Sequence, residues 1–289
     1  MVEPQAGYPL ARLTTVRAGG AADHFARAGT LRELQELLEW ARQRDLRVQV
    51  LGSGSNLLVA DAGVRGLVLK LERDLARIEP DGEGLRVGAG ARLPAVAARS
   101  AAAGLAGIEF GVNIPGTVGG AVAMNAGGHG STTGDRLVSA RIVDLVSGRE
   151  RTVGPDGLDL SYRHSNVLTH EIVLEARFAG TAGARAAAEA EISAIVRWRR
   201  ANQPGGRNAG SVFTNPPGDS AGRLIESCGL KGYRIGSAEV SSKHANFFQC
   251  DADGCADDII ELIEAVRGLV LAATGVELST ELRIVGPRR

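Results

Sequence analysis

Two glycine-rich loops in the first half of the chain constrain its fold more than any other feature. Both carry almost no charge, and the first directly follows an apolar stretch, residues 48–51, that is typical of a strand. Glycine allows the backbone to approach an anion closely and to turn several N–H groups toward it. The loops are Gly52-Ser53-Gly54-Ser55-Asn56, and Ile114-Pro115-Gly116-Thr117-Val118-Gly119-Gly120 with the following Asn125-Ala126-Gly127. The pair predicts a cradle of backbone N–H groups around a pyrophosphate.

Each loop also has a plainer interpretation. The first is not a dinucleotide-binding fingerprint, because Leu57 stands where a third glycine would be, and no Gly-Lys-Ser/Thr follows as in a P-loop. By itself it is equally compatible with a simple turn. The second loop could be a tightly packed crossover of small residues. Two such loops in one half of the chain favour the phosphate site, and long loops inside compact domains are usually functional.

Helix and strand patterns alternate irregularly along the chain. Thr30 to Glu33 is a capping box that predicts a helix, and residues 257–274 predict another that ends before Gly275. A linker is expected at residues 180–187. Short apolar strands are expected near residues 67–71, 85–87, 141–146 and 172–178. Without regular βαβ spacing, the pattern indicates an α+β protein of more than one domain.

Composition excludes several classes of partner. The formal net charge is zero, so neither nucleic acid nor an anionic membrane is expected. The first ten residues show no secretory signal pattern, and no apolar run is long enough to cross a bilayer. The cysteines, Cys228, Cys250 and Cys255, indicate reduced thiols in a cytoplasmic protein. Cys250 and Cys255 flank two aspartates, but no second ligand pair lies nearby, so no metal is expected.

The loops resemble the FAD-binding domain of the vanillyl-alcohol oxidase/p-cresol methylhydroxylase superfamily. Further motifs extend the likeness over nearly the whole chain, which resembles the UDP-N-acetylenolpyruvoylglucosamine reductase (UDP-N-acetylmuramate dehydrogenase) family. These motifs are Tyr162-Arg163-His164-Ser165, Ala209-Gly210-Ser211-Val212-Phe213, Gly229-Leu230-Lys231-Gly232-Tyr233-Arg234, Lys243-His244-Ala245-Asn246 and Glu281-Leu282-Arg283. The resemblance implies an FAD-binding domain over residues 1–180, in lobes of about 1–72 and 73–180. An α+β substrate-binding domain is expected over residues 181–289.

The resemblance also implies a reaction. NADPH reduces FAD, and flavin N5 passes hydride to the enolpyruvyl group of UDP-N-acetylglucosamine enolpyruvate. Protonation then gives UDP-N-acetylmuramate for peptidoglycan synthesis. The FAD is expected to be non-covalent, because the first loop contains neither His nor Cys. A monomer is expected.

Three residues match the family's catalytic positions, and each also has an ordinary interpretation. Ser211 matches the proton donor, although a Ser after Gly is commonly a turn residue or helix cap. Arg163 matches the arginine that polarises the substrate carboxylate, and its planar charge suits an enolate. In so Arg-rich a chain it could equally be a surface arginine. Glu281 matches that arginine's partner, but it also fits an exposed position of an alternating strand.

The remaining candidates would bind the substrate. Lys231, Tyr233 and Arg234 share a loop, His244 follows shortly, and lysine occurs elsewhere only at Lys70 and Lys243. Such a group of donors in a neutral chain indicates a site for the UDP diphosphate, although a solvated basic loop is the alternative. Tyr162 and Asn215 match substrate contacts of the family, and Asn246 could assist. Thr214 stands where the family often has Lys or Arg, which removes one possible phosphate charge.

Two features bear on subclass and alternatives. No insertion carrying a substrate-covering tyrosine loop lies between Arg163 and Ser211, so the chain resembles the family's shorter branch. A flavin-binding module with a decayed active site would lack part of the trio Arg163, Ser211 and Glu281, which is complete here. An oxygen-using oxidase of the superfamily is the other alternative, but the second half of the chain matches the reductase.

Overall fold

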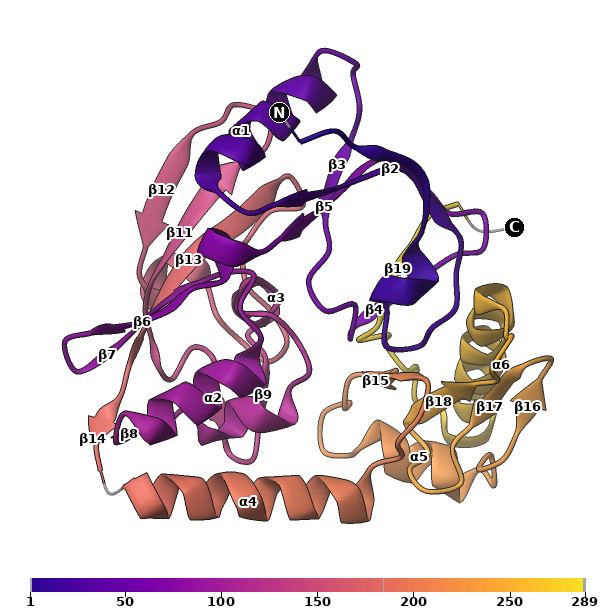
Figure 1. The fold of residues 1–289 in the computed structure, drawn as a ribbon. Helices are drawn as coiled ribbons and strands as arrows, with labels where there is room; N and C mark the ends of the chain where they lie inside the picture. Colours follow the sequence, from indigo (N-terminus) through magenta and orange to yellow (C-terminus); the bar gives the residue numbers. More distant parts are fainter. Residues whose placement is uncertain (1, 184, 288–289) are drawn as a thin grey trace. The chain divides into compact units, whose positions relative to one another are not determined.

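The computed structural model describes residues 2–183 and 185–287. Within this part of the chain, helices and strands mix irregularly and form two compact units (Figure 1). Unit 1 comprises the described residues among 1–5, 24–53 and 66–199, and unit 2 those among 6–23, 54–65 and 200–289. The chain therefore passes repeatedly from one unit to the other, and neither is one continuous stretch of sequence.

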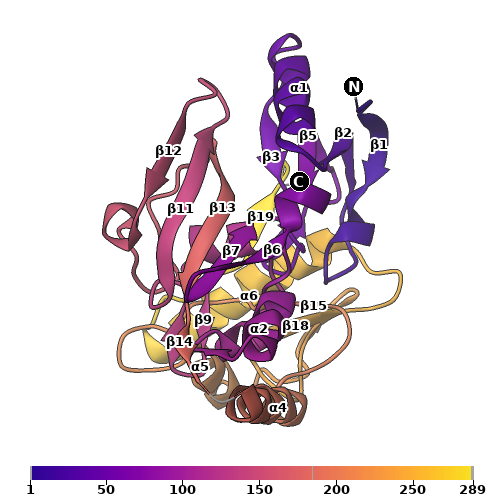
Figure 2. The ribbon, with the colours of Figure 1, turned by 60° about the vertical axis from the view of Figure 1, so that its left-hand side comes forward.

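A four-stranded sheet has the order β1-β2-β5-β3. Strands β3 and β5 pair in parallel, with Val50 opposite Leu69. In unit 1 the helix α1 (Leu31–Arg42) lies on one face of β3 and β5 (Figures 1 and 2), and its residues Leu34, Leu37 and Ala41 are buried in the core. The strands are β1 (Gln5–Pro9), β2 (Ala21–Ala28), β3 (Val48–Val50) and β5 (Val64–Leu71).

Another sheet, which belongs to unit 1 as a whole, has five antiparallel strands in the order β12-β11-β13-β7-β6. They are β6 (Ile78–Asp81), β7 (Gly84–Gly88), β11 (Leu137–Asp144), β12 (Glu150–Val153) and β13 (Glu171–Ala179). The helices α2 (Leu93–Ala102) and α3 (Val118–Ala123) pack on it, and their apolar residues join the same hydrophobic core as α1.

Short elements complete unit 1. Two-residue strands form the pairs β8 (Leu105–Ala106) with β14 (Thr181–Ala182) and β9 (Gly127–Gly128) with β10 (Ser131–Thr132). Helix α4 (Arg185–Asn202) leads along the sequence from unit 1 into unit 2. Short 3-10 helices of unit 1 span Arg73–Ala76, Glu109–Asn113 and Pro155–Leu158, whereas the 3-10 helix Leu10–Leu13 belongs to unit 2.

Unit 2 has its own hydrophobic core, built around α6 (Ala256–Thr274) and α5 (Ala221–Ser227). Its antiparallel sheet has the order β15-β18-β17-β16, and a parallel pair joins β19 to β4. The strands are β4 (Leu57–Val59), β15 (Asn208–Ser211), β16 (Arg234–Ile235), β17 (Ala238–Val240), β18 (Phe247–Cys250) and β19 (Arg283–Val285).

The α+β class expected from the sequence is confirmed, and so are several elements. The Thr30 side chain accepts from Glu33 N, and Glu33 reciprocates at the Thr30 backbone, which completes the predicted capping box. Gly275 ends α6 with a φ of 73°, where a side chain would be strained. The linker expected at residues 180–187 instead contains β14 and the start of α4 within its described residues. The domain boundary near residue 180 remains a prediction.

Candidate active site

The first glycine loop begins where β3 ends and offers unused N–H groups. Leu51 N donates to Leu69 O at 2.8 Å, as a last rung of the β3–β5 pair. Among the described residues, no hydrogen bond is donated by the backbone N–H groups of residues 52–56. At Gly54 the φ is 61°, and a Cβ would lie 2.4 Å from Leu13 O, so only glycine fits there. A run of free amide donors is the feature an anion requires.

The second loop lies against the start of the first within unit 1. A Cβ on Gly52 would lie 2.5 Å from Thr117 Oγ1, so the two loops approach to a distance that only glycine allows. Thr117 forms an antiparallel bridge with Arg92, and Val118 N donates to Ala91 O at 2.9 Å. In the described part of the chain, the N–H groups of Gly116, Thr117 and Gly120 donate no bond. These amides extend the donor set of the first loop.

The neighbouring glycines Gly119 and Gly120 differ in their surroundings. A Cβ on Gly119 would lie 3.1 Å from Ala89 Cβ, and Gly119 N already donates to Ala89 O at 2.9 Å. Gly119 therefore serves the packing of α3. A Cβ on Gly120 would meet only Thr117 Oγ1, at 3.8 Å. The space beside Gly120 is open, as a cofactor contact requires.

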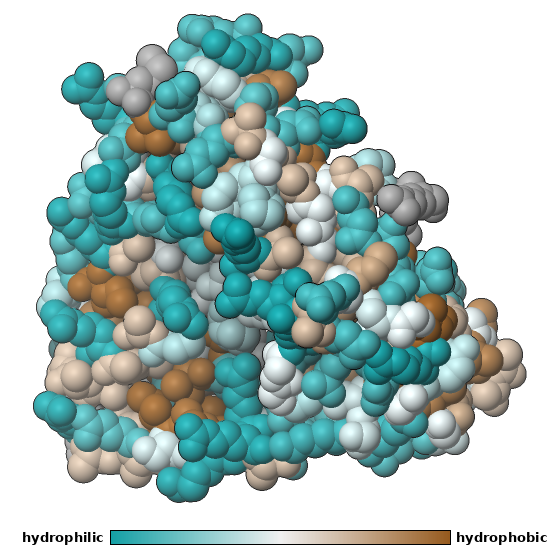
Figure 3. Space-filling model, turned by 45° about the vertical axis from the view of Figure 1, so that its right-hand side comes forward, coloured by the Kyte–Doolittle hydropathy of each residue, from teal (hydrophilic) through white to brown (hydrophobic). Residues whose placement is uncertain are grey.

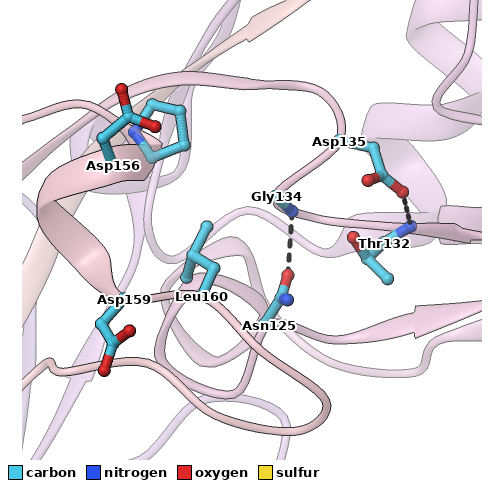
Figure 4. Close-up of a pocket in the computed structure, with 8 residues that line it drawn as sticks. Asn125, Thr132, Gly134, Asp135, Asp156, Asp159 and Leu160 are labelled. Carbon is cyan, nitrogen blue, oxygen red and sulfur yellow. Dashed lines mark hydrogen bonds between the residues drawn. The ribbon is translucent and has the colours of Figure 1, made fainter.

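Asn125 has a bracing role that the sequence did not reveal. Its side chain is buried, and its Nδ2 donates to Ser161 O at 3.0 Å. Its Oδ1 accepts from Gly134 N at 2.9 Å, and Figure 4 marks this bond with a dashed line. Both ends of the amide are therefore engaged, and this holds the side chain in a fixed orientation between Ser161 and Gly134. Ala126, the next residue predicted to contact the cofactor, accepts at its carbonyl from Thr133 Oγ1 at 2.8 Å, which fixes its backbone. Gly127, the last of these predicted residues, begins β9.

A pocket of about 310 Å³ lies beside Asn125 in unit 1. Figure 4 shows its lining, which includes the carboxylates of Asp135, Asp156 and Asp159. Negative charge of this density disfavours a pyrophosphate. This pocket is therefore not the expected cofactor cradle, which lies at the glycine loops.

Asn113, directly before Ile114, tests whether the loops fit a dinucleotide. Its Oδ1 is buried, and within residues 2–183 and 185–287 it has no hydrogen-bond partner. A buried polar atom without a partner costs about 1–3 kcal/mol, so a bound group that donates to it would remove a penalty. Together with the free amides, this atom fits a polar cofactor such as FAD. Sequence reasoning missed Asn113, because an Asn beside a Pro-Gly loop is common.

Arg163 sits at the tip of a tight turn in unit 1. Ser161 and His164 exchange N–H···O bonds of 3.2 Å across the turn, and Arg163 has a φ of 57°. The Arg163 guanidinium lies 5.1 Å from the ring centroid of Tyr162, which is 56% exposed. Asn125 binds the base of this turn, so the segment after the second glycine loop positions the arginine.

Ser211 and Glu281 lie on adjacent segments of unit 2. Ser211 ends β15 opposite Phe247, and the next residue, Val212, accepts at its carbonyl from Glu281 N at 2.8 Å. The first glycine loop reaches the same place, because Asn56 Nδ2 donates to Glu281 O at 3.1 Å and Asn56 O accepts from Arg283 N at 3.2 Å. The structure thus brings together the segments that carry Ser211 and Glu281 and the end of the predicted cofactor loop.

Asn246 holds the chain directly after Ser211, a role that sequence reasoning did not assign. Its side chain is 3% exposed, its Oδ1 accepts from Phe213 N at 2.9 Å, and its Nδ2 donates to Phe213 O at 2.8 Å. Its own carbonyl accepts from Val212 N at 2.9 Å. The amide therefore acts as a bracket that fixes the backbone at Val212 and Phe213. In the sequence, the only indication of this role is that Asn246 is a polar residue within an apolar stretch.

The predicted substrate donors are in unit 2, and two of them are already paired. Lys231 Nζ contacts Glu226 at 2.6 Å, and Arg234 pairs with Glu239 at 2.9 Å and also with Asp251. Tyr233 is 38% exposed. An incoming diphosphate would compete with these carboxylates, so the local charge is less positive than the sequence suggested.

Two further substrate candidates are engaged within unit 2. His244 Nδ1 accepts from Asn246 N at 3.2 Å, and its ring meets the Phe247 ring edge-on at 4.8 Å. Burial lowers the pKa of His244, which favours the neutral ring. Asn215 Oδ1 accepts from Ala221 N at 3.1 Å at the start of α5. A substrate contact of Asn215 would use its remaining amide hydrogens.

The cysteines form no disulfide in the described chain, where all three are free thiols. Burial raises the pKa of Cys255, and its thiol donates to Asp61 at 2.6 Å. No cluster of potential metal ligands occurs among the residues that the structure describes. A helix long and apolar enough to span a membrane is likewise absent from them.

Comparison with known proteins gives consistent matches along the chain. Two family models match, an FAD binding domain over residues 22–154 and the C-terminal domain of UDP-N-acetylenolpyruvoylglucosamine reductase over residues 202–285. UDP-N-acetylenolpyruvoylglucosamine reductase 2 of Symbiobacterium thermophilum is 45% identical, over 96% of this chain and 91% of its own length. The reductase of Rubrobacter xylanophilus is 43% identical, over 96% and 94%. The solved structure of the Thermus caldophilus reductase is 33% identical with a TM-score of 0.86, covering 99% of this chain and 100% of that chain.

Proposed function

Because this chain belongs to the UDP-N-acetylenolpyruvoylglucosamine reductase family, we propose that it reduces UDP-N-acetylglucosamine enolpyruvate to UDP-N-acetylmuramate. This is a step of peptidoglycan precursor synthesis, with NADPH as the reductant. The placement of Ser211 beside the Glu281 segment, tied by Asn56 to a glycine loop, carries the proposal most directly.

The cofactor is FAD, and the residues present fit it. When bound, FAD takes hydride from NADPH and supplies it to the enolpyruvyl double bond. The free N–H groups of residues 52–56 and of Gly116, Thr117 and Gly120 would hold its pyrophosphate. Ile114 and Pro115 would shape the cradle through the fixed φ of proline. No His or Cys stands in either loop, so the attachment is non-covalent.

Arg163 would bind and polarise the substrate carboxylate. A guanidinium remains charged at any physiological pH and presents parallel donors that match two carboxylate oxygens. Hydride adds to the terminal carbon of the enolpyruvyl group, and negative charge develops on the carbon next to the carboxylate and spreads onto the carboxylate oxygens. These donors would stabilise that charge. Tyr162, stacked near Arg163, would cover the same part of the substrate.

Ser211 would donate the proton that completes the reduction. A serine hydroxyl is a weak acid in water, so Ser211 would act as proton donor because of its position and not because of its pKa. Glu281 would act at the substrate carboxylate, the role that its family motif implies, and its segment is fixed to Val212 by the backbone bond from Glu281 N. Asn215, Lys231, Tyr233, Arg234 and His244 would contact the UDP-sugar.

We also propose that the enzyme works as a monomer in the cytoplasm, where NADPH and nucleotide sugars are available. On the face shown in Figure 3, hydrophilic residues predominate and hydrophobic residues gather only in small groups. Such a surface suits a protein dissolved among small-molecule substrates.

A steady-state assay tests the function. The purified protein should show a flavin absorption spectrum and should oxidise NADPH rapidly only when UDP-N-acetylglucosamine enolpyruvate is present. Product mass should exceed substrate mass by two hydrogens. NADPH consumption that ignores the enolpyruvyl substrate would count against the proposal.

A further inference from the structure

We propose that Lys70 and Arg92 form a cationic pair that holds the pyrophosphate of FAD beside the two glycine loops. The proposal rests on FAD being the cofactor. Neither glycine loop contains Lys or Arg, so the sequence indicates a neutral pyrophosphate site. The proposal adds two positively charged side chains to that site.

Lys70 lies next to the point at which the first loop begins. The preceding residue, Leu69, accepts at its carbonyl from Leu51 N at 2.8 Å, and Gly52 follows Leu51. Leu69 and Leu71 belong to the hydrophobic core, and side chains alternate along a strand, so Lys70 leaves β5 on the opposite face. Ligands of α/β sheets commonly bind at the carboxyl ends of parallel strands, which is where β3 and β5 deliver this loop.

Arg92 lies at the second loop. Its bridge to Thr117 is accompanied by a bond from Leu93 N to Gly116 O at 3.0 Å. The turn before Arg92 also reaches β5, because a Cβ on Gly90 would lie 2.2 Å from Leu71 O. The two neighbours of Lys70 in β5 therefore contact the two loop segments: Leu69 contacts Leu51, and Leu71 contacts Gly90. The two cations stand at the two loops that meet at Gly52 and Thr117.

Neither cation is compensated by the protein through direct contact. Within the described residues, no hydrogen bond or ion pair is made by the side chains of Lys70 and Arg92. The nearby Arg27, in contrast, pairs with Glu72. A half-buried ammonium without a partner is unfavourable, which points to a ligand that supplies the missing charge.

The electrostatic environment of Lys70 supports the same conclusion. Burial lowers the pKa of Lys70, and although Glu72 opposes this shift, Arg27 and Arg92 lower the pKa further. Positive charge is therefore concentrated at a place where the protein leaves backbone N–H groups free. A pyrophosphate, with two negative charges, satisfies both the cations and the amides. The 2′-phosphate of NADPH has similar chemistry, and the experiment separates the two.

The test uses the flavin-loaded enzyme and measures FAD release on dilution, through the rise in flavin fluorescence. Lys70→Gln and Arg92→Gln should each weaken FAD retention about tenfold to a hundredfold, the range expected for a hydrogen bond to a charged group. Both should also make FAD release less sensitive to NaCl, because fewer ionic contacts remain to be screened. Arg99→Gln is the matched control, since Arg99 is exposed on the last turn of α2.

Lys70→Arg, which keeps the positive charge, distinguishes loss of charge from loss of folding as the cause of weaker FAD retention. It should restore most of the FAD retention lost in Lys70→Gln, and circular dichroism should show that both variants are folded. If Lys70→Gln and Arg92→Gln release FAD no faster than Arg99→Gln, the proposal is wrong. If they retain FAD but raise KM for NADPH and not for NADH, the anion is the 2′-phosphate and the proposal is overturned. A parent enzyme that binds no FAD would instead refute the proposed function.

Discussion

Ser211 is the side chain whose role a single substitution isolates most cleanly. Its hydroxyl is required only after hydride has reached the substrate, so Ser211→Ala should leave flavin reduction by NADPH nearly intact. Reoxidation by the enolpyruvyl substrate should slow by about two to four orders of magnitude, the usual contribution of general acid catalysis. Stopped-flow absorbance of the flavin resolves the two half-reactions. Equal slowing of both would make Ser211 a structural residue of its turn.

Asn246 allows a second test at the residue scale. Asn246→Ala leaves the N–H and C=O of Phe213 buried without their side-chain partners. Each unsatisfied group costs about 1–3 kcal/mol, so the free energy of unfolding should fall by about 2–6 kcal/mol. Urea unfolding followed by circular dichroism measures this loss. Asn166→Ala, which removes one exposed hydrogen bond to Gly157 O, is the control and should cost under about 1 kcal/mol.

At the scale of elements, the second glycine loop and α3 separate cofactor binding from packing. A Cβ at Gly120 meets open space, whereas a Cβ at Gly119 meets Ala89. Gly120→Val should therefore lower FAD occupancy while the fold remains stable. Gly119→Val should instead destabilise the protein, because overpacking costs about 1–3 kcal/mol. Flavin content and thermal unfolding distinguish these outcomes, and a Gly120→Val variant that retains FAD fully would show that the loop has only a structural role.

Sequence patterns among neighbouring residues predicted the ends of helices well, but they did not predict contacts between residues far apart in the chain. The capping box at Thr30 and the stop at Gly275 depend on neighbouring residues, so the sequence alone identified them. The bond from Asn56 to Glu281 joins residues 225 positions apart, and no local pattern encodes it. In the sequence, Lys70 stands out only as one of three lysines, because its place beside the loops depends on the β3–β5 pairing.

At the scale of the whole molecule, the proposed functional residues are divided between the two compact units. Unit 1 holds Arg163 and the second loop, unit 2 holds Ser211 and Glu281, and the first loop contributes residues to both. The family resemblance predicted these residues by motif. It could not predict that residues 6–23 and 54–65 group with the second half of the chain, because contact between distant segments decides that division.

The mode of flavin attachment is a property of the whole protein that can be checked directly. With no His or Cys in either glycine loop, acid precipitation should release the flavin into the supernatant. The denatured polypeptide should then show no flavin fluorescence on a gel. Fluorescence that remains with the polypeptide would indicate a covalent bond elsewhere in the chain.

The most direct test of the central claim is a single turnover without oxygen. The enzyme is reduced by one equivalent of NADPH and then mixed with UDP-N-acetylglucosamine enolpyruvate, while flavin absorbance is recorded. We predict rapid return of the oxidised flavin spectrum with formation of one equivalent of UDP-N-acetylmuramate. Flavin that stays reduced with this substrate, yet reoxidises rapidly when air is admitted, would contradict the account and indicate an oxidase.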